Sequence, residues 1–444
     1  MKLVNHRITM EAFSAFARGG GGEEAVRQIL RVQRSRNILL LRAIVKAAIR
    51  QRHPEATAAR EAYQSLTMIE RIAPTATATV ANYPLVSAWA LNTLMKLRTA
   101  RGEAANPRLL ALVAAAAAVR GAVTIEMDLS AAMATDNRII LPSLGTVTFA
   151  SYKGGGVTLR CGPAGAQVVG GDVTVPVPSD PHCSSDGWHG LPLISAECDG
   201  ERIDLLLDFL LCDDGDRIIG TPKQVINSRT VDIWRSLIGD AWRILVRYHH
   251  QTAVELRAAV SVLAPLALPS TNLVSATPTK ALGCIAMTRP GDALTVALTL
   301  AHELQHVKLT ALARLFRLVD PNREDRFYAP WRNDPRPAIG LLHGAYAHLG
   351  VAAFWREQRH HNTGNSASQH GHIEFARWRS AVRDAVRRLV RSGILTSLGR
   401  LFTNGMLGIL DEWIGERVPA DAAAVAARLA EDHRKTWVAV HGDP

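Results

Sequence analysis

Cysteine is scarce in this 444-residue sequence, and its five copies are widely spaced. None of them forms a CxxC pair, and their odd number does not suit a set of disulfides. The sequence therefore predicts neither a disulfide-stapled secreted domain nor a cysteine-ligated zinc site. Because free cysteines are typical of a reducing compartment, we expect a cytoplasmic protein.

The sequence also lacks a long apolar run. The longest, Leu109–Val119, ends at Arg120, well short of the roughly 18 residues that a membrane span needs. The first residues contain no apolar segment of the kind that directs secretion. We therefore expect neither membrane insertion nor export.

Aromatic residues make up only 5% of the chain and charged residues 20%, whereas hydrophobic residues make up 48%, which excludes wholesale disorder. The length exceeds the roughly 250–300 residues that one core serves, so two or three packed units are expected. The excess of 51 basic over 40 acidic side chains, a net charge of +11, is spread along the chain. Because no nucleic-acid recognition motif accompanies it, we expect no nucleic-acid partner.

Hydrophobic periodicity predicts an α+β fold that is predominantly α-helical. Residues 1–120 and 231–444 show helical spacing, and residues 121–230 contain β-branched stretches between turn residues. The predicted strands are Val123–Met127, Arg138–Leu141, Thr146–Phe149 and Val173–Val175. The predicted C-terminal helices are Asp232–Leu263, Leu294–Leu318, Ile339–Arg356, Ile373–Arg391 and Asp421–Trp437. An exposed edge in the strand-rich region could receive an extended peptide.

Residue chemistry and spacing agree on a mechanism in the segment Thr299–Leu309. Its His302 and His306 lie four residues apart in an otherwise apolar stretch, so both imidazoles stand on one helix face and can bind one cation. Glu303 lies about 100° round the helix. There it can support a ligand or, in a zinc peptidase, deprotonate metal-bound water. The sequence therefore predicts a metal centre on this helix.

The third ligand decides the class of enzyme. The metzincin extension HExxHxxGxxH fails, because Leu309 and Leu312 replace its glycine and its last histidine. A zinc peptidase would then need a downstream carboxylate. Glu324 and Asp325 are within range, but they lie in a loop-like stretch rather than on a helix, which weakens the peptidase interpretation.

The next predicted helix offers His343 among small residues, and we take it as the third ligand. His348, five residues on, lies about 140° away and is not expected on the same face. Either histidine could instead be a satisfied core residue. Three neutral nitrogen ligands suit Fe(II), with positions left for a keto acid and dioxygen, although zinc tolerates the same ligands.

The linker Tyr328–Pro337 between the two histidine elements is stiffened by three prolines and carries Arg332 and Arg336 close to Trp331. A preorganised guanidinium group is what a dicarboxylate cosubstrate needs. The alternative is that each arginine is salt-bridged to Asp334 or stacked on the indole. Both interpretations stay open at this point.

In these blocks the sequence resembles the HExxH-type 2-oxoglutarate-dependent peptide β-hydroxylases, which are found beside ribosomal peptide natural-product clusters. The likeness is carried, in this order, by Ala301–Leu309, Tyr328–Pro337 and Gly340–Tyr346, and it spans roughly residues 283–356. It implies Fe(II), 2-oxoglutarate and dioxygen as reactants. It further implies a ribosomally made precursor peptide as partner and hydroxylation at a side-chain β-carbon.

The resemblance also assigns residues. It makes three histidines the iron ligands: His302, His306 and His343. It matches three basic residues to positions that could hold the keto acid: Lys308, Arg332 and Arg336. No radical SAM cysteine motif is present, so the chain is similar to the stand-alone form. The runner-up function is a zinc peptidase with Glu303 as general base, and the oligomeric state is not predicted.

Overall fold

The computed structural model describes residues 6–99, 104–133, 136–150, 152–208, 227–266, 273–361 and 365–442. The fold is α+β and predominantly α-helical, as predicted. The helices are α1 (Met10–Ala17), α2 (Gly22–Arg50), α3 (Ala56–Ile72), α4 (Pro74–Ala81), α5 (Pro84–Leu97), α6 (Leu110–Arg120), α7 (Ser228–Tyr248), α8 (His250–Ala259), α9 (Ala293–Ala313), α10 (Ala338–Gln358), α11 (Asn365–Arg391), α12 (Ser397–Ile414) and α13 (Ala420–His441).

The strands form small sheets. They are β1 (Ile125–Asp128), β2 (Arg138–Leu141), β3 (Gly145–Thr148), β4 (Val157–Gly162), β5 (Gly165–Gly170), β6 (Val173–Val177), β7 (Trp188–Gly190), β8 (Leu193–Cys198), β9 (Glu201–Leu207), β10 (Val262–Pro265), β11 (Ser275–Ala276), β12 (Cys284–Met287), β13 (Arg326–Phe327) and β14 (Arg336–Pro337). All four strands predicted from β-branched stretches are confirmed, by β1, β2, β3 and β6.

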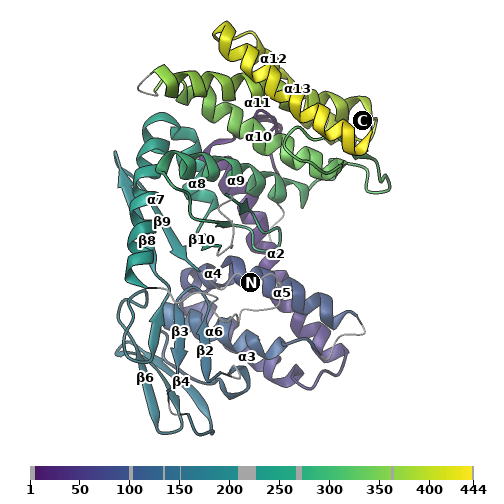
Figure 1. Ribbon diagram of the computed structural model, residues 1–444. Coiled ribbons are helices and arrows are strands. Elements are labelled where there is room, and N and C mark those ends of the chain that lie inside the picture. The colour runs from purple at the N-terminus through teal and green to yellow at the C-terminus, as the bar shows by residue number, and fades with distance from the viewer. Residues whose placement is uncertain are drawn as a thin grey trace.

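Two hydrophobic cores organise the chain. One gathers α1, the start of α2 and helices α7 to α12, and the other gathers the end of α2, helices α3 to α6 and strands β1 to β7. Figure 1 shows α2 passing from the half that holds α8 to α13 to the half that holds α3 to α6. The long second helix therefore contributes to both cores and ties them together.

A five-stranded sheet, in the order β11-β12-β10-β9-β8, lies between the two cores. Side chains alternate along its strands, so Leu205 and Leu263 face the first core while Leu206 and Val262 face the second. Strands β8 and β9 come from the strand-rich region, and the other three come from the following region. The strand-rich region is thus continuous with the part of the chain that carries the HExxH motif.

The long helix predicted over Asp232–Leu263 is wrong at its end. It breaks at His249 into α7 and α8, and from Val262 the chain is a strand. Val262–Pro265 pairs with β9 on one side and β12 on the other, both in parallel. A continuous apolar segment suits a strand buried on both faces, and periodicity alone does not distinguish it from a buried helix. Helix α12 was not predicted.

Helix α10 is long and apolar enough to cross a membrane, but 67% of its most apolar window is buried inside the fold. It packs against α9 and α11. Its apolar surface is therefore mostly covered by the rest of the fold. Residence in the cytoplasm stays a prediction.

Candidate metal centre

Helix α9 positions the HExxH residues. Its N-terminus is capped by Asp292, whose carboxylate accepts a hydrogen bond from the backbone N–H of Thr295 at 2.9 Å. Most of the helix is buried, and Glu303 and Lys308 are among its buried polar side chains. His302 is only partly buried, with 22% of its side chain exposed. The helix therefore presents its histidines at the margin of the core.

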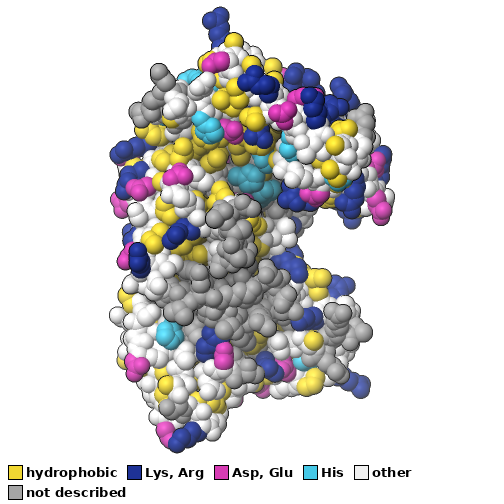
Figure 2. Space-filling view, in the orientation of Figure 1, with side chains coloured by type: hydrophobic (Ala, Val, Ile, Leu, Met, Phe, Trp, Pro, Cys, Tyr) yellow, Lys and Arg dark blue, Asp and Glu magenta, His cyan; other side chains and the backbone are white. Residues whose placement is uncertain are grey.

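Four imidazoles from α9 and α10 meet in one histidine cluster. The ring centres of His302 and His306 lie 5.0 Å apart, those of His302 and His348 5.1 Å, and those of His306 and His343 5.9 Å. Figure 2 shows histidine side chains gathered on the visible surface at the level of α9. The structure thus brings together all three predicted histidine ligands and adds a fourth ring.

The expectation that His348 would lie outside the site does not hold. On α9, His302 precedes His306, and on α10, His343 precedes His348. The first histidine of α9 lies next to the second histidine of α10, and the second of α9 lies next to the first of α10. The two helices therefore run antiparallel where they cross, and both α10 histidines reach α9. The angle between His343 and His348 round α10 does not show how α10 crosses α9, so it could not predict this contact.

Burial keeps the four rings neutral at pH 7. It lowers the pKa of His306, of His343 and of His348 to about 4. It lowers the pKa of His302 well below the usual value, with a further contribution from the neighbouring His348 and His306. A neutral imidazole has a lone pair on one ring nitrogen, which is the form that binds a metal ion.

Two of the three ring spacings are close to what one shared ion requires. With metal–nitrogen bonds of about 2.1 Å, two imidazoles on the same ion have their ring centres roughly 5 Å apart. The His302–His306 and His302–His348 spacings match this value. Within the described ranges, no three His, Cys, Asp or Glu side chains already enclose a cation. These two spacings are therefore compatible with one shared ion, but the ring nitrogens do not converge on one in this arrangement.

Glu303 is almost completely buried, with 1% of its side chain exposed. The hydroxyl groups of Ser275 and Thr277 each donate to one of its carboxylate oxygens, both at 2.7 Å. The nearer oxygen lies 3.9 Å from Nε2 of His302. Burial raises the pKa of Glu303, and the two hydroxyl donors oppose this shift. The carboxylate is thus held against β11 and beside His302.

The arginines of the linker are engaged by one carboxylate. Arg332 donates to Asp334 at 2.8 Å and Arg336 donates to the other oxygen of the same carboxylate at 3.1 Å. The structure therefore shows the salt bridges that the sequence left open as the alternative to cosubstrate binding. What the linker brings to the histidine cluster is Trp331, whose ring stacks on His348 at 4.5 Å.

Lys308 lies away from the histidine cluster. Its ammonium group is fully buried and donates to Glu255 at 2.6 Å and to the carbonyl oxygens of Gly19 and Gly20 at 2.8 and 3.2 Å. Burial lowers the pKa of Lys308, and Glu255 opposes this. The predicted role of Lys308 in binding the keto acid does not fit this placement, because its donors are used inside the core.

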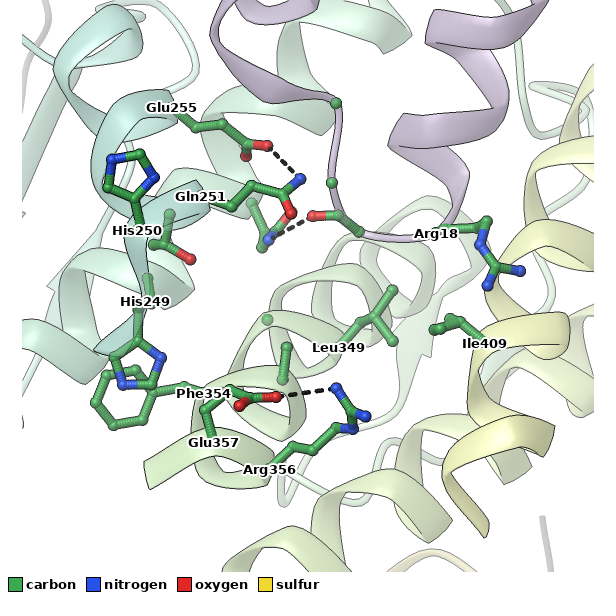
Figure 3. A pocket seen from close by; sticks show the side chains of 18 of the residues that line it. Arg18, His249, His250, Gln251, Glu255, Leu349, Phe354, Arg356, Glu357 and Ile409 are labelled. Carbon is green, nitrogen blue, oxygen red and sulfur yellow. Dashed lines mark hydrogen bonds and ion pairs between the residues drawn. The ribbon is translucent and has the colours of Figure 1, made fainter. Parts of the chain in front are cut away.

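A cleft of about 570 Å³ lies on a different side of α9. It is lined by Ala301 and Gln305 of that helix and by none of the four histidines of the cluster. Figure 3 shows Gln251 and Glu255 on one wall and Arg356 beside Glu357 on another. Both of these pairs are held by hydrogen bonds, at 3.1 and 2.9 Å. The cleft and the histidine cluster are therefore separate features that share α9 and α10.

Some residues around the cluster were missed from the sequence: Ser275, Thr277 and Trp378. None of them belongs to a motif, so no local signal could have found them. The chain matches no family model and resembles no curated protein closely enough for a match.

Proposed function

We propose that this protein is a non-haem iron enzyme that uses 2-oxoglutarate and dioxygen to hydroxylate a side-chain β-carbon of a ribosomally made peptide. The observation that carries the proposal is the meeting of neutral imidazoles from α9 and α10, because the His302–His306 and His302–His348 ring spacings suit one ion. His302, His306 and a histidine of α10 would hold Fe(II), which supplies the redox chemistry that dioxygen requires. Three nitrogen ligands leave room for a keto acid and dioxygen.

The order of the three sequence blocks supports the same proposal, because together they resemble one family of peptide hydroxylases. The alternative is a zinc peptidase, in which Glu303 would take a proton from metal-bound water. Both oxygens of Glu303 already accept hydroxyl hydrogen bonds from Ser275 and Thr277. This arrangement favours a supporting role for the carboxylate over a role as a mobile proton acceptor.

Glu303→Gln separates the two functions. In the proposed oxygenase no water has to be deprotonated, so we expect the variant to keep at least about a tenth of the keto-acid-dependent oxidation. In a zinc peptidase the loss of the general base would cost about 10²–10⁴-fold. The measurement incubates protein and a pool of synthetic peptides with iron, 2-oxoglutarate and air, and then with zinc alone. Succinate is quantified and the peptides are weighed.

The matched control is Glu431→Gln, which removes an exposed carboxylate on α13. It should leave every product unchanged. A peptide mass gain of one oxygen that requires 2-oxoglutarate supports the proposal. Peptide cleavage with zinc alone, lost in Glu303→Gln and kept in Glu431→Gln, would replace it with the peptidase.

Strand β11 supports a peptide substrate. Among the described strands it is the last of its sheet, antiparallel to β12. Thr288 donates its backbone N–H to the carbonyl of Val274, so these two residues form a hydrogen-bonded pair. Because hydrogen-bonded and non-hydrogen-bonded pairs alternate along an antiparallel ladder, the next pair, Ser275 with Met287, is non-hydrogen-bonded. The N–H and C=O of Ser275 therefore point away from β12, where an extended peptide can pair with them.

The same strand passes directly beside the histidine cluster, since the Ser275 hydroxyl donates to Glu303. Just before it, Leu273 and Val274 are 49% and 38% exposed, so two large apolar side chains lie next to this edge. A peptide paired with β11 would cover them. The strand-rich region was expected to receive the peptide, and this expectation stays untested, but β11 offers an edge that is closer to the histidines.

Comparing Ser275→Pro with Ser275→Ala tests this edge. Both variants lose the hydroxyl that reaches Glu303, but only proline also removes the outward N–H, and neither removes a bond to β12. We expect proline to weaken peptide binding about tenfold relative to alanine, the effect of one main-chain hydrogen bond of about 1.4 kcal/mol. Isothermal titration with the peptide that gains oxygen measures the ratio. Equal affinities would exclude pairing at Ser275.

A further inference from the structure

The ring of His348 is held on two sides. Trp331 stacks on it at 4.5 Å with 15° between the planes, and Trp378 lies 4.5 Å away at 45°. The stack with Trp331 depends on Gly344, because a Cβ there would lie 2.3 Å from the indole nitrogen. An imidazole packed between two indoles has little rotational freedom. These two contacts therefore restrict how the ring of His348 can turn.

The tautomer of His348 is set as well. Its Nδ1 lies 2.9 Å from the carbonyl oxygen of Gly344. A carbonyl can only accept, so Nδ1 carries the hydrogen and the lone pair is on Nε2. A ring N–H donated to a backbone carbonyl is the support that metal-ligating histidines normally have, because it orients the ring and makes the other nitrogen a better ligand.

His343 has less support of this kind. Its ring lies 5.9 Å from His306 and is nearly parallel to it, at 23°. Among the described residues, its ring nitrogens have no hydrogen-bond partner that would fix a tautomer. His348, in contrast, stands 5.1 Å from His302 and nearly perpendicular to it, close to the spacing and angle of the His302–His306 pair.

We propose that His348, rather than His343, completes with His302 and His306 the set of histidines that holds a divalent transition-metal ion. The inference rests on the proposed function, since it names a ligand of the same site. His343 then lies beside the set and packs on His306. Trp331 and Trp378 are positioning residues that act on the metal through His348.

Metal binding can be measured without cosubstrate or turnover. Metal-free protein is titrated with cobalt(II), which is followed by its visible absorption and by isothermal titration. The variants are His348→Phe and His343→Phe, in which the new ring replaces the imidazole at similar size. The loss of a group that only supports a ligand costs roughly 10–100-fold in metal affinity, so we expect His348→Phe, which removes a ligand, to lower cobalt affinity more than about 100-fold. We expect His343→Phe to change cobalt affinity less than about threefold, because His343 is not a ligand in this assignment.

Trp331→Leu gives a second, independent measurement. It removes the stack and leaves every histidine in place, so we expect cobalt affinity to fall about tenfold, together with a change in the cobalt spectrum. Thermal melting of the metal-free variants shows whether each one folds. If His348→Phe does not fold, His348→Gln takes its place in the same titration.

Equal losses in the two histidine variants, or a larger loss in His343→Phe, would overturn the assignment. Unchanged affinity in both would overturn it too. These outcomes are distinct from failure of the proposed function. If the wild-type protein binds cobalt through His348 but oxidises no peptide, the proposed oxygenase function is wrong and this ligand assignment still stands.

Discussion

Replacing His306 with alanine is expected to lower metal affinity by about 100-fold to 1,000-fold and to abolish metal-dependent turnover. His306 contacts both His302 and His343, so it belongs to the set whichever histidine of α10 is the third ligand. Four-ligand zinc sites gain about 10–16 kcal/mol on binding, or about 2.5–4 kcal/mol for each ligand, which corresponds to that range. The same loss is expected for His302→Ala.

Two measurements check this prediction. Metal content is determined after anaerobic reconstitution with iron, and the melting temperature is recorded with and without a chelator. Chelation should lower the melting temperature of the wild type, because a ligand that binds only the folded state stabilises it, and it should not change that of His306→Ala. The control is His250→Ala, since this histidine is exposed on α8. Full iron content in His306→Ala would remove the basis for a metal enzyme.

The local part of the site could be predicted from the sequence. Residues four apart on a helix share a face wherever that helix lies, so the pairing of His302 and His306 needed no tertiary information. The starts of α9 and α10 followed from apolar spacing for the same reason, and both helices are confirmed, but α9 ends at Ala313 and not at the predicted Leu318. The β-branched stretches likewise predicted strands, because period-two alternation is a local property.

The rest of the site depends on how distant elements meet. His348 was set aside from its angle round α10, but the crossing of α10 with α9 brings it to His302. Glu303 is held by Ser275 and Thr277, which lie on or next to a two-residue strand that the sequence did not predict. These contacts join residues far apart in the chain, and rules based on local sequence spacing cannot predict them.

The basic residues show the same limit. Charge and position suggested Arg332 and Arg336 for a carboxylate ligand, and the resemblance added Lys308, but each finds a carboxylate within the protein. A sequence shows which side chains are cationic, whereas their partners depend on the fold. Asp334 lies within the same linker and was therefore foreseeable as an alternative. Glu255 lies on another helix and was not.

Lys308→Met is expected to destabilise the protein by about 3–5 kcal/mol, because it leaves the carboxylate of Glu255 buried without its counter-ion. Glu255 is 2% exposed and would keep only the backbone N–H of Gly22 and the amide of Gln251 as donors. Gly19 and Gly20 would each lose the ammonium donor as well. Urea unfolding followed by circular dichroism measures the change.

Lys435→Met is the matched control, because it removes the lysine of an exposed pair with Glu431, and it should cost less than about 1 kcal/mol. Adding Glu255→Gln to Lys308→Met removes both buried charges and should restore much of the lost stability.

That double variant also tests the role that the resemblance assigned to Lys308. If the double variant folds and still binds 2-oxoglutarate with wild-type affinity, the role of Lys308 is to pair with Glu255 in the core. If it folds and binds no 2-oxoglutarate, Lys308 takes part in binding the cosubstrate. A cost for Lys308→Met no larger than for Lys435→Met would show that the buried pair contributes little to stability.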